Sequence, residues 1–135
     1  MMTLPELESL VRRMEDCTLP REEWTHRAHL SVAVWYLFQF PRKVATERIR
    51  TGIQRYNASL GNTTSYHETI TLSWVAIVAS FLRDASAEKT LAELATEAAA
   101  RFGASDYLLR HFSKERLFSE VARREWVEPD LQLFG

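Results

Sequence analysis

Three of the chain's four histidines lie in two short polar motifs, and these residues have the types and spacing that could do chemistry. The two motifs are Trp24-Thr25-His26-Arg27-Ala28-His29-Leu30 and Tyr66-His67-Glu68-Thr69-Ile70-Thr71. His26 and His29 are three residues apart, so on a helix their side chains are neighbours on one face. A second helix that carries His67 and Glu68 could complete a cluster of three or four ligands.

This spacing predicts a metal centre. Imidazole and carboxylate groups that converge on one point bind divalent Zn, Fe, Mn or Ni. We expect His26, His29 and His67 to be the metal ligands, with one coordination position open. A metal-bound water in that position can have a pKa near 7 and act as a nucleophile. Glu68 is then a fourth ligand or the catalytic general base, and in place of one histidine it would give the two-His-one-carboxylate triad of non-haem iron.

Two further residues are candidates for completing this site. On a helix that begins near Pro20, Glu22 falls in the same sector as the two histidines of the first motif, opposite Trp24. His111 has no paired partner nearby in the sequence, and we interpret it as a partly exposed helical residue.

The same polar residues could instead serve the fold. Glu68 follows Ser65 by three residues, which is the spacing of a capping box at the start of a helix. Tyr66, Thr69 and Thr71 could satisfy one another as a buried polar network. Three hypotheses therefore stand: a metal site, a metal-free catalytic or small-molecule pocket, and a structural network in a non-enzymatic helical module.

The elements that must position these residues are helical throughout. The apolar spacing predicts an all-α, single-domain bundle of five to seven helices over residues 1–135. Thr3-Leu4-Pro5-Glu6 has the pattern of a capping box and opens the first helix. The second helix is predicted from Pro20 to Phe40, and it is apolar nearly all round after Ala28, as a central helix would be.

The remaining helices follow the same pattern. Gly52 lies in the buried stripe of the third helix and predicts a close crossing by a neighbouring helix. Ser65 and Ser86 are predicted to cap the fourth and fifth helices, and Gly103 to end the fifth. Residues 106–126 should form two short helices that meet near Ser113. The apolar tail after Trp126 should lie back across the bundle.

Composition limits the partners and the compartment. Seventeen Lys and Arg against eighteen Asp and Glu give a formal net charge of −1, so we expect no nucleic-acid partner. The longest apolar stretch, Leu30 to Phe40, is far short of the ~20 residues that span a membrane. The N-terminus has no signal-peptide pattern, and the single Cys17 cannot form an internal disulfide. We therefore expect a cytoplasmic protein whose partner is a small-molecule ligand.

The two histidine motifs, taken together with Trp126-Val127-Glu128-Pro129-Asp130-Leu131, resemble those of a family of small uncharacterised bacterial proteins. The likeness covers residues 20–133. It implies an all-helical fold in which the histidine motifs and the tail belong together, and it implies no substrate or mechanism, since no activity is established for the family.

Overall fold

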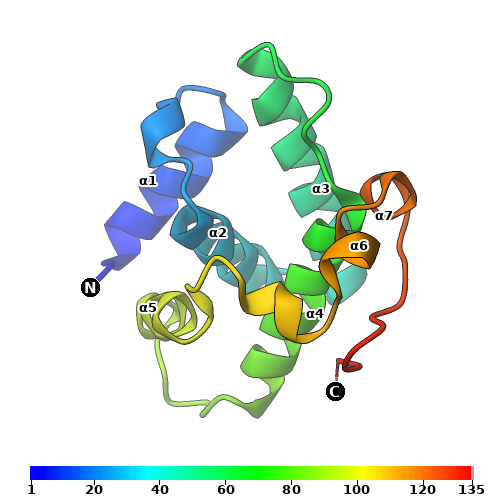
Figure 1. Ribbon diagram of the computed structural model, residues 1–135. Coiled ribbons are helices and arrows are strands. Elements are labelled where there is room, and N and C mark those ends of the chain that lie inside the picture. The colour runs from blue at the N-terminus through cyan, green and yellow to red at the C-terminus, as the bar shows by residue number, and fades with distance from the viewer. Residues whose placement is uncertain (135) are drawn as a thin grey trace.

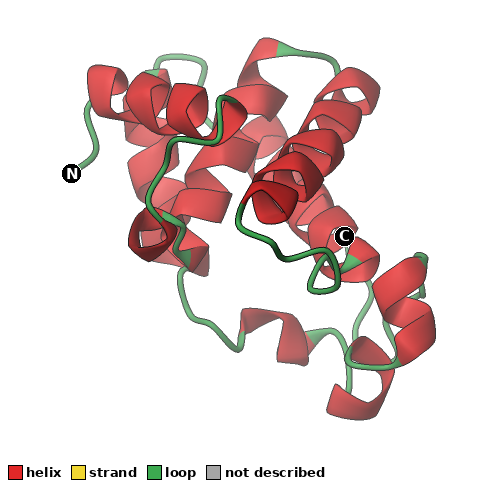
Figure 2. Ribbon diagram, turned by 90° about the horizontal axis from the view of Figure 1, so that it is seen from above, coloured by secondary structure: helices red, strands yellow, loops and turns green. Residues whose placement is uncertain are grey.

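The computed structural model describes residues 1–134 and confirms the all-α bundle. These residues form seven α-helices and two 3₁₀ helices and no strand. Figure 2 shows helices joined by loops. None of the helices within residues 1–134 has the length and apolarity needed to cross a membrane. In chain order the elements are α1 (Leu4–Glu15), η1 (Arg21–Glu23), α2 (His26–Gln39), α3 (Arg42–Ser59), α4 (Glu68–Asp84), α5 (Leu91–Phe102), η2 (Tyr107–Arg110), α6 (Lys114–Leu117) and α7 (Glu120–Arg124).

Helix α2 is the centre of the bundle, as its apolar sequence predicts. It packs against α1, α3, α4 and α5, which surround it in Figure 1. Its side chains are buried on more than one face, because neighbours cover it from several sides. The buried positions of α2 are Ala28, Leu30, Ser31, Val32, Ala33, Val34 and Tyr36.

The predicted start of this helix is wrong. Residues 21–23 form the separate 3₁₀ helix η1, and the chain then turns at Trp24 before α2 begins. Thr25 has extended backbone angles, and its side-chain oxygen accepts a hydrogen bond from the N–H of Ala28. Thr25 is therefore a helix cap, which interrupts the continuous helix expected from Pro20.

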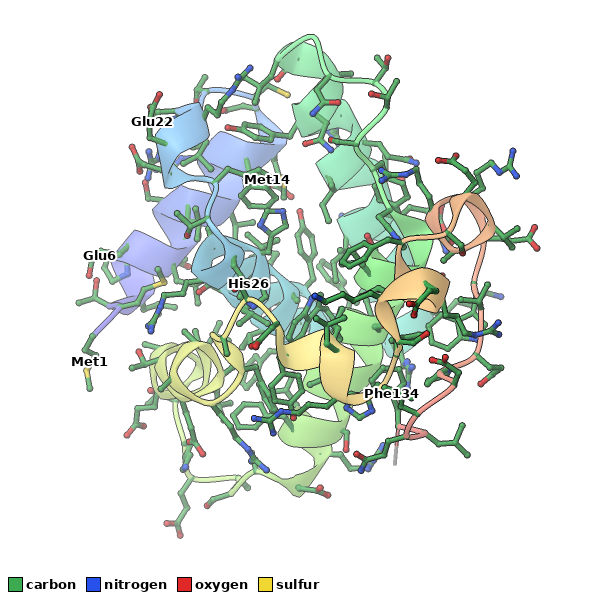
Figure 3. All side chains as sticks on the ribbon, viewed as in Figure 1. Met1, Glu6, Met14, Glu22, His26 and Phe134 are labelled. Atoms are coloured by element: carbon green, nitrogen blue, oxygen red, sulfur yellow. The ribbon has the colours of Figure 1, made fainter. Side chains whose placement is uncertain are left out.

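Two local predictions for α1 and α3 are confirmed. Thr3 and Glu6 form the reciprocal hydrogen bonds of a capping box at the start of α1. A Cβ atom on Gly52 would lie 3.3 Å from both Sδ and Cε of Met14, so α1 and α3 cross closely there. Figure 3 shows Met14 on the side of α1 that faces α3.

Two predicted helix caps are wrong, namely those of α4 and α5. Thr90 caps α5 in a capping box with Glu93, and Ser86 does not cap it. Two short helices are predicted to meet near Ser113; Ser113 is the cap of α6, and the region divides into three elements, η2, α6 and α7. The tail lies back across the bundle, where the N–H of Val127 donates to Thr69 Oγ1 at 3.2 Å.

Candidate small-molecule pocket

His67 is buried at the start of α4 and serves as its cap. Its Nδ1 accepts a hydrogen bond from the N–H of Ile70 at 3.1 Å, and its Nε2 lies 2.7 Å from the carbonyl oxygen of Leu117. A backbone N–H can only donate, so Nδ1 carries no proton and Nε2–H donates to Leu117. His67 is thus held neutral with both nitrogens bonded. Its role corrects the prediction that Ser65 caps this helix.

Because the cap is His67, Glu68 is the first residue of α4 and does not close a capping box. Arg50 of α3 binds its carboxylate through two hydrogen bonds, Nε to Oε1 at 3.1 Å and Nη2 to Oε2 at 2.6 Å. The hydroxyl of Tyr66 donates to the same Oε1 at 2.6 Å. Burial raises the pKa of Glu68, but the hydrogen bonds from Arg50 and Tyr66 outweigh it and leave the pKa below its usual value. The predicted general base is therefore an ionised partner of Arg50.

His26 is bonded to the backbone at the end of α5. Its Nε2 lies 3.1 Å from the carbonyl oxygen of Phe102, and its ring packs against that of Trp74 at 4.9 Å between centroids. Carbonyl groups in the last turn of a helix have no intrahelical donor, so an imidazole N–H is a suitable partner. Figure 3 shows His26 at the start of α2, beside the segment that follows α5.

His29, like His26, has one ring nitrogen without a hydrogen-bond partner among residues 1–134, but of these two histidines only His29 lines the pocket described below. Nδ1 lies 2.8 Å from the carbonyl oxygen of Thr25, so Nδ1–H is the donor and Nε2 keeps its lone pair. Within residues 1–134, no group forms a hydrogen bond with Nε2. The ring packs against that of Trp24, with centroids 3.8 Å apart and the planes tilted by 32°. Burial lowers the pKa of His29 to about 4, so the imidazole is neutral at pH 7.

The structure does not bring the predicted metal ligands together. Among residues 1–134, no group of three or more His, Cys, Asp or Glu side chains is placed to hold a metal ion. His67 has no free nitrogen, and His26 points to the end of α5. Glu22 is exposed on η1, and His111 donates from Nδ1 to the carbonyl oxygen of Gln132 at 2.8 Å.

A pocket of about 680 Å³ adjoins His29. Its lining residues come from η1, the start of α2, α3 and the segment that leads into α4. Figure 1 shows where these elements lie in the bundle. His67 lines the pocket too, so the cap of α4 also shapes its wall. The lining residues are Arg21, Trp24, His29, Ile53, Asn57, Leu60, Gly61, Asn62, Thr63, Thr64, Ser65, Tyr66, His67, Ile70 and Thr71.

The pocket combines apolar walls with neutral polar groups. Arg21 is the one lining residue with a permanent charge among those described. Burial, with the hydrogen bond to Glu68 second, raises the pKa of Tyr66 to about 12, so this phenol is protonated at pH 7. The imidazole of His29 is the basic group in a mostly uncharged surrounding. Such a pocket can hold a small polar molecule and accept a hydrogen bond from it.

Sequence reasoning missed three contributors to this pocket, namely Trp24, Arg21 and Asn57. On a continuous helix Trp24 lies opposite His29, yet their rings pack together, because the chain turns between η1 and α2. The signal available was Thr25, a favourable cap residue directly before the motif's histidines.

In comparisons with known proteins, no protein-family model, no curated protein and no solved structure matches this chain. Function is therefore inferred from the side chains of the pocket.

Proposed function

We propose that the protein binds a small polar organic molecule in the pocket beside His29, and that His29 Nε2 accepts a hydrogen bond from it. The observation that carries this proposal is the state of the His29 ring. Its Nδ1–H is fixed by the carbonyl oxygen of Thr25, and Nε2 has no partner among residues 1–134. A neutral histidine whose tautomer is set in this way presents one hydrogen-bond acceptor in a defined direction.

The lining residues limit the class of molecule. Trp24, Ile53 and Ile70 provide apolar surface for the body of the ligand. Asn57, Thr63, Thr64 and Ser65 provide hydrogen-bonding groups. Since Arg21 is the only permanent charge in the described lining, the molecule is neutral or anionic and carries an O–H or N–H donor for His29.

The other two histidines of the motifs support this pocket as structural groups. His26 joins α2 to the end of α5, and His67 joins α4 to the end of α6. The structural-network hypothesis and the metal-free-pocket hypothesis thus divide by residue: the network accounts for His26 and His67, and the metal-free pocket accounts for His29. A cytoplasmic setting belongs to the same proposal, because the lone thiol of Cys17 suits a reducing compartment.

The test is a fragment titration followed by ¹H–¹⁵N NMR. We expect polar aromatic fragments with an O–H or N–H donor to shift the amide signals of residues 24–30 and 57–66. His29→Phe keeps a ring to pack against Trp24 but removes Nε2, and it should weaken these fragments about 10-fold, as expected when a hydrogen bond of about 1.4 kcal/mol is lost. His111→Phe is the matched control: His111 lines a different pocket, so the fragments should shift the signals of residues 24–30 and 57–66 with wild-type affinity. Fragments that bind His29→Phe with unchanged affinity, or that leave both segments unshifted, would refute the proposal.

A further inference from the structure

A second pocket lies toward the other end of α4, where α4 meets α5, η2 and the tail. Its volume is about 440 Å³. Thr71, early in α4, lines the first pocket, whereas Phe81, ten residues further along the helix, lines the second. The floor of the second pocket is aromatic and its rim is basic, from Phe81, Phe102, Tyr107, Arg42, Arg83 and Arg101.

The three rim arginines carry uncompensated charge. Within residues 1–134, none of them forms an ion pair with a carboxylate, whereas Arg13 pairs with Glu23 and Arg50 pairs with Glu47 and Glu68. The one carboxylate that lines the pocket is Asp84. Three guanidinium groups against one carboxylate leave the pocket positive, so it attracts anions.

Arg101 is held in place by the aromatic floor. Its guanidinium carbon lies 5.9 Å from the ring centroid of Phe81 and 5.3 Å from that of Phe102. A guanidinium that contacts aromatic faces keeps its N–H groups free along its edges, where they match the two oxygens of a carboxylate. The pocket therefore places a fork of donors beside an apolar surface.

We propose that this second pocket binds an organic anion with a flat apolar body, of the aromatic carboxylate class. The ring lies against Phe81, Phe102 and Tyr107, and the carboxylate is bound by Arg101 with Arg83 and Arg42 nearby. An inorganic anion fits less well, because it would pair with the arginines but leave the aromatic floor without an apolar contact. This inference rests on residues other than those of the His29 pocket.

The test compares 2-naphthoate with its uncharged analogue 2-naphthamide, each titrated into the full chain and followed by ¹H–¹⁵N NMR. We expect 2-naphthoate to bind more tightly and to shift the signals of Ser80, Phe81 and Tyr107. Arg101→Met keeps an apolar stem over the rings but removes the charge, and it should weaken 2-naphthoate at least 5-fold while 2-naphthamide is unaffected. Arg83→Gln, at an exposed position, is the second variant and should weaken 2-naphthoate as well.

Arg124→Gln is the matched control, since Arg124 is an exposed arginine on α7 outside the pocket. It should bind 2-naphthoate as the wild type does. The proposal is overturned if 2-naphthamide binds as tightly as 2-naphthoate, if both pocket variants keep wild-type affinity, or if the shifted signals lie at Trp24 and Tyr66. The last outcome assigns the anion to the first pocket, so the two proposals fail separately.

Discussion

The imidazole of His67 donates from Nε2 to the carbonyl oxygen of Leu117 at 2.7 Å, across 50 residues of sequence. The carbonyl of Leu117 is in the last turn of α6, where no helical N–H reaches it. The other nitrogen of the same ring caps α4. One side chain therefore satisfies a donor at the start of one helix and an acceptor at the end of another, which couples the C-terminal third of the chain to the wall of the first pocket.

Two substitutions of His67 distinguish the contributions of these two hydrogen bonds to stability. His67→Ala should lower the free energy of unfolding by about 2–4 kcal/mol, of which about 1 kcal/mol is the cap and the rest the buried carbonyl of Leu117 left without a donor. Asparagine is a good cap but is too short to reach Leu117, so His67→Asn should recover only the cap's share. Urea denaturation followed by circular dichroism measures both. If His67→Asn were as stable as the wild type, the bond to Leu117 would contribute nothing.

The all-α fold class and most of the helices could be predicted, because the spacing of apolar residues and the capping residues are local signals in the sequence. The capping box of Thr3 and Glu6 depends on two residues that are close in sequence. The close crossing at Gly52 depends on the absence of a side chain at that position. Thr90 and Glu93 carry an equally local signal, four residues after Ser86, and the correct start of α5 could have been predicted from it.

The candidate site could be predicted only in part, because partners distant in sequence decide its chemistry. The motifs predict a functional role for His29, which stays a prediction, but spacing cannot show that the carbonyl oxygens of Phe102 and Leu117 bind Nε2 of His26 and of His67. Likewise Glu68 has the spacing of a capping box, and the interaction that determines its role is with Arg50 on another helix. A helical wheel also cannot represent the turn at Trp24.

Zinc provides a direct test of the metal centre that the spacing predicts. We expect Zn²⁺ at a few equivalents to leave the melting temperature unchanged, because coordination by His67 would require it to give up its bonds to Ile70 and Leu117. A site occupied at 100 times its Kd would stabilise the fold by about 2.7 kcal/mol. Differential scanning fluorimetry with and without Zn²⁺ distinguishes an unchanged melting temperature from this stabilisation. A zinc-dependent rise that disappears in His26→Ala would establish the metal centre instead.

The ion pair between Arg50 and Glu68 should be coupled more strongly than an exposed pair. Both side chains are partly buried, with 27% and 17% of their surfaces exposed, and two hydrogen bonds join them. A double-mutant cycle with Arg50→Met and Glu68→Gln should give a coupling energy of about 1–2 kcal/mol in thermal or urea unfolding, against 0.2–1 kcal/mol that is typical of exposed pairs. A cycle with Arg13 and Glu23, whose side chains are 34% and 51% exposed, is the internal control. Equal coupling in both cycles would contradict the structural role given to Glu68.

The low pKa of His29 makes stability depend on pH in a defined direction. Its pKa is about 4 in the folded protein and about 6.5 in the unfolded chain, so the folded state binds fewer protons between these values. The stabilisation is complete above about pH 6.5 and is lost as the pH falls toward about 4. His29→Phe keeps a ring against Trp24 without a titrating group, while His67 and the carboxylates titrate alike in both proteins. Urea unfolding of the two proteins at pH 7 and pH 5 should show the wild type losing about 2 kcal/mol more than the variant, from about 1.4 kcal/mol per pH unit over this range. Parallel losses in the two proteins would mean that His29 is protonated as readily in the folded state as in the unfolded one, and the neutral base in the pocket would have to be abandoned.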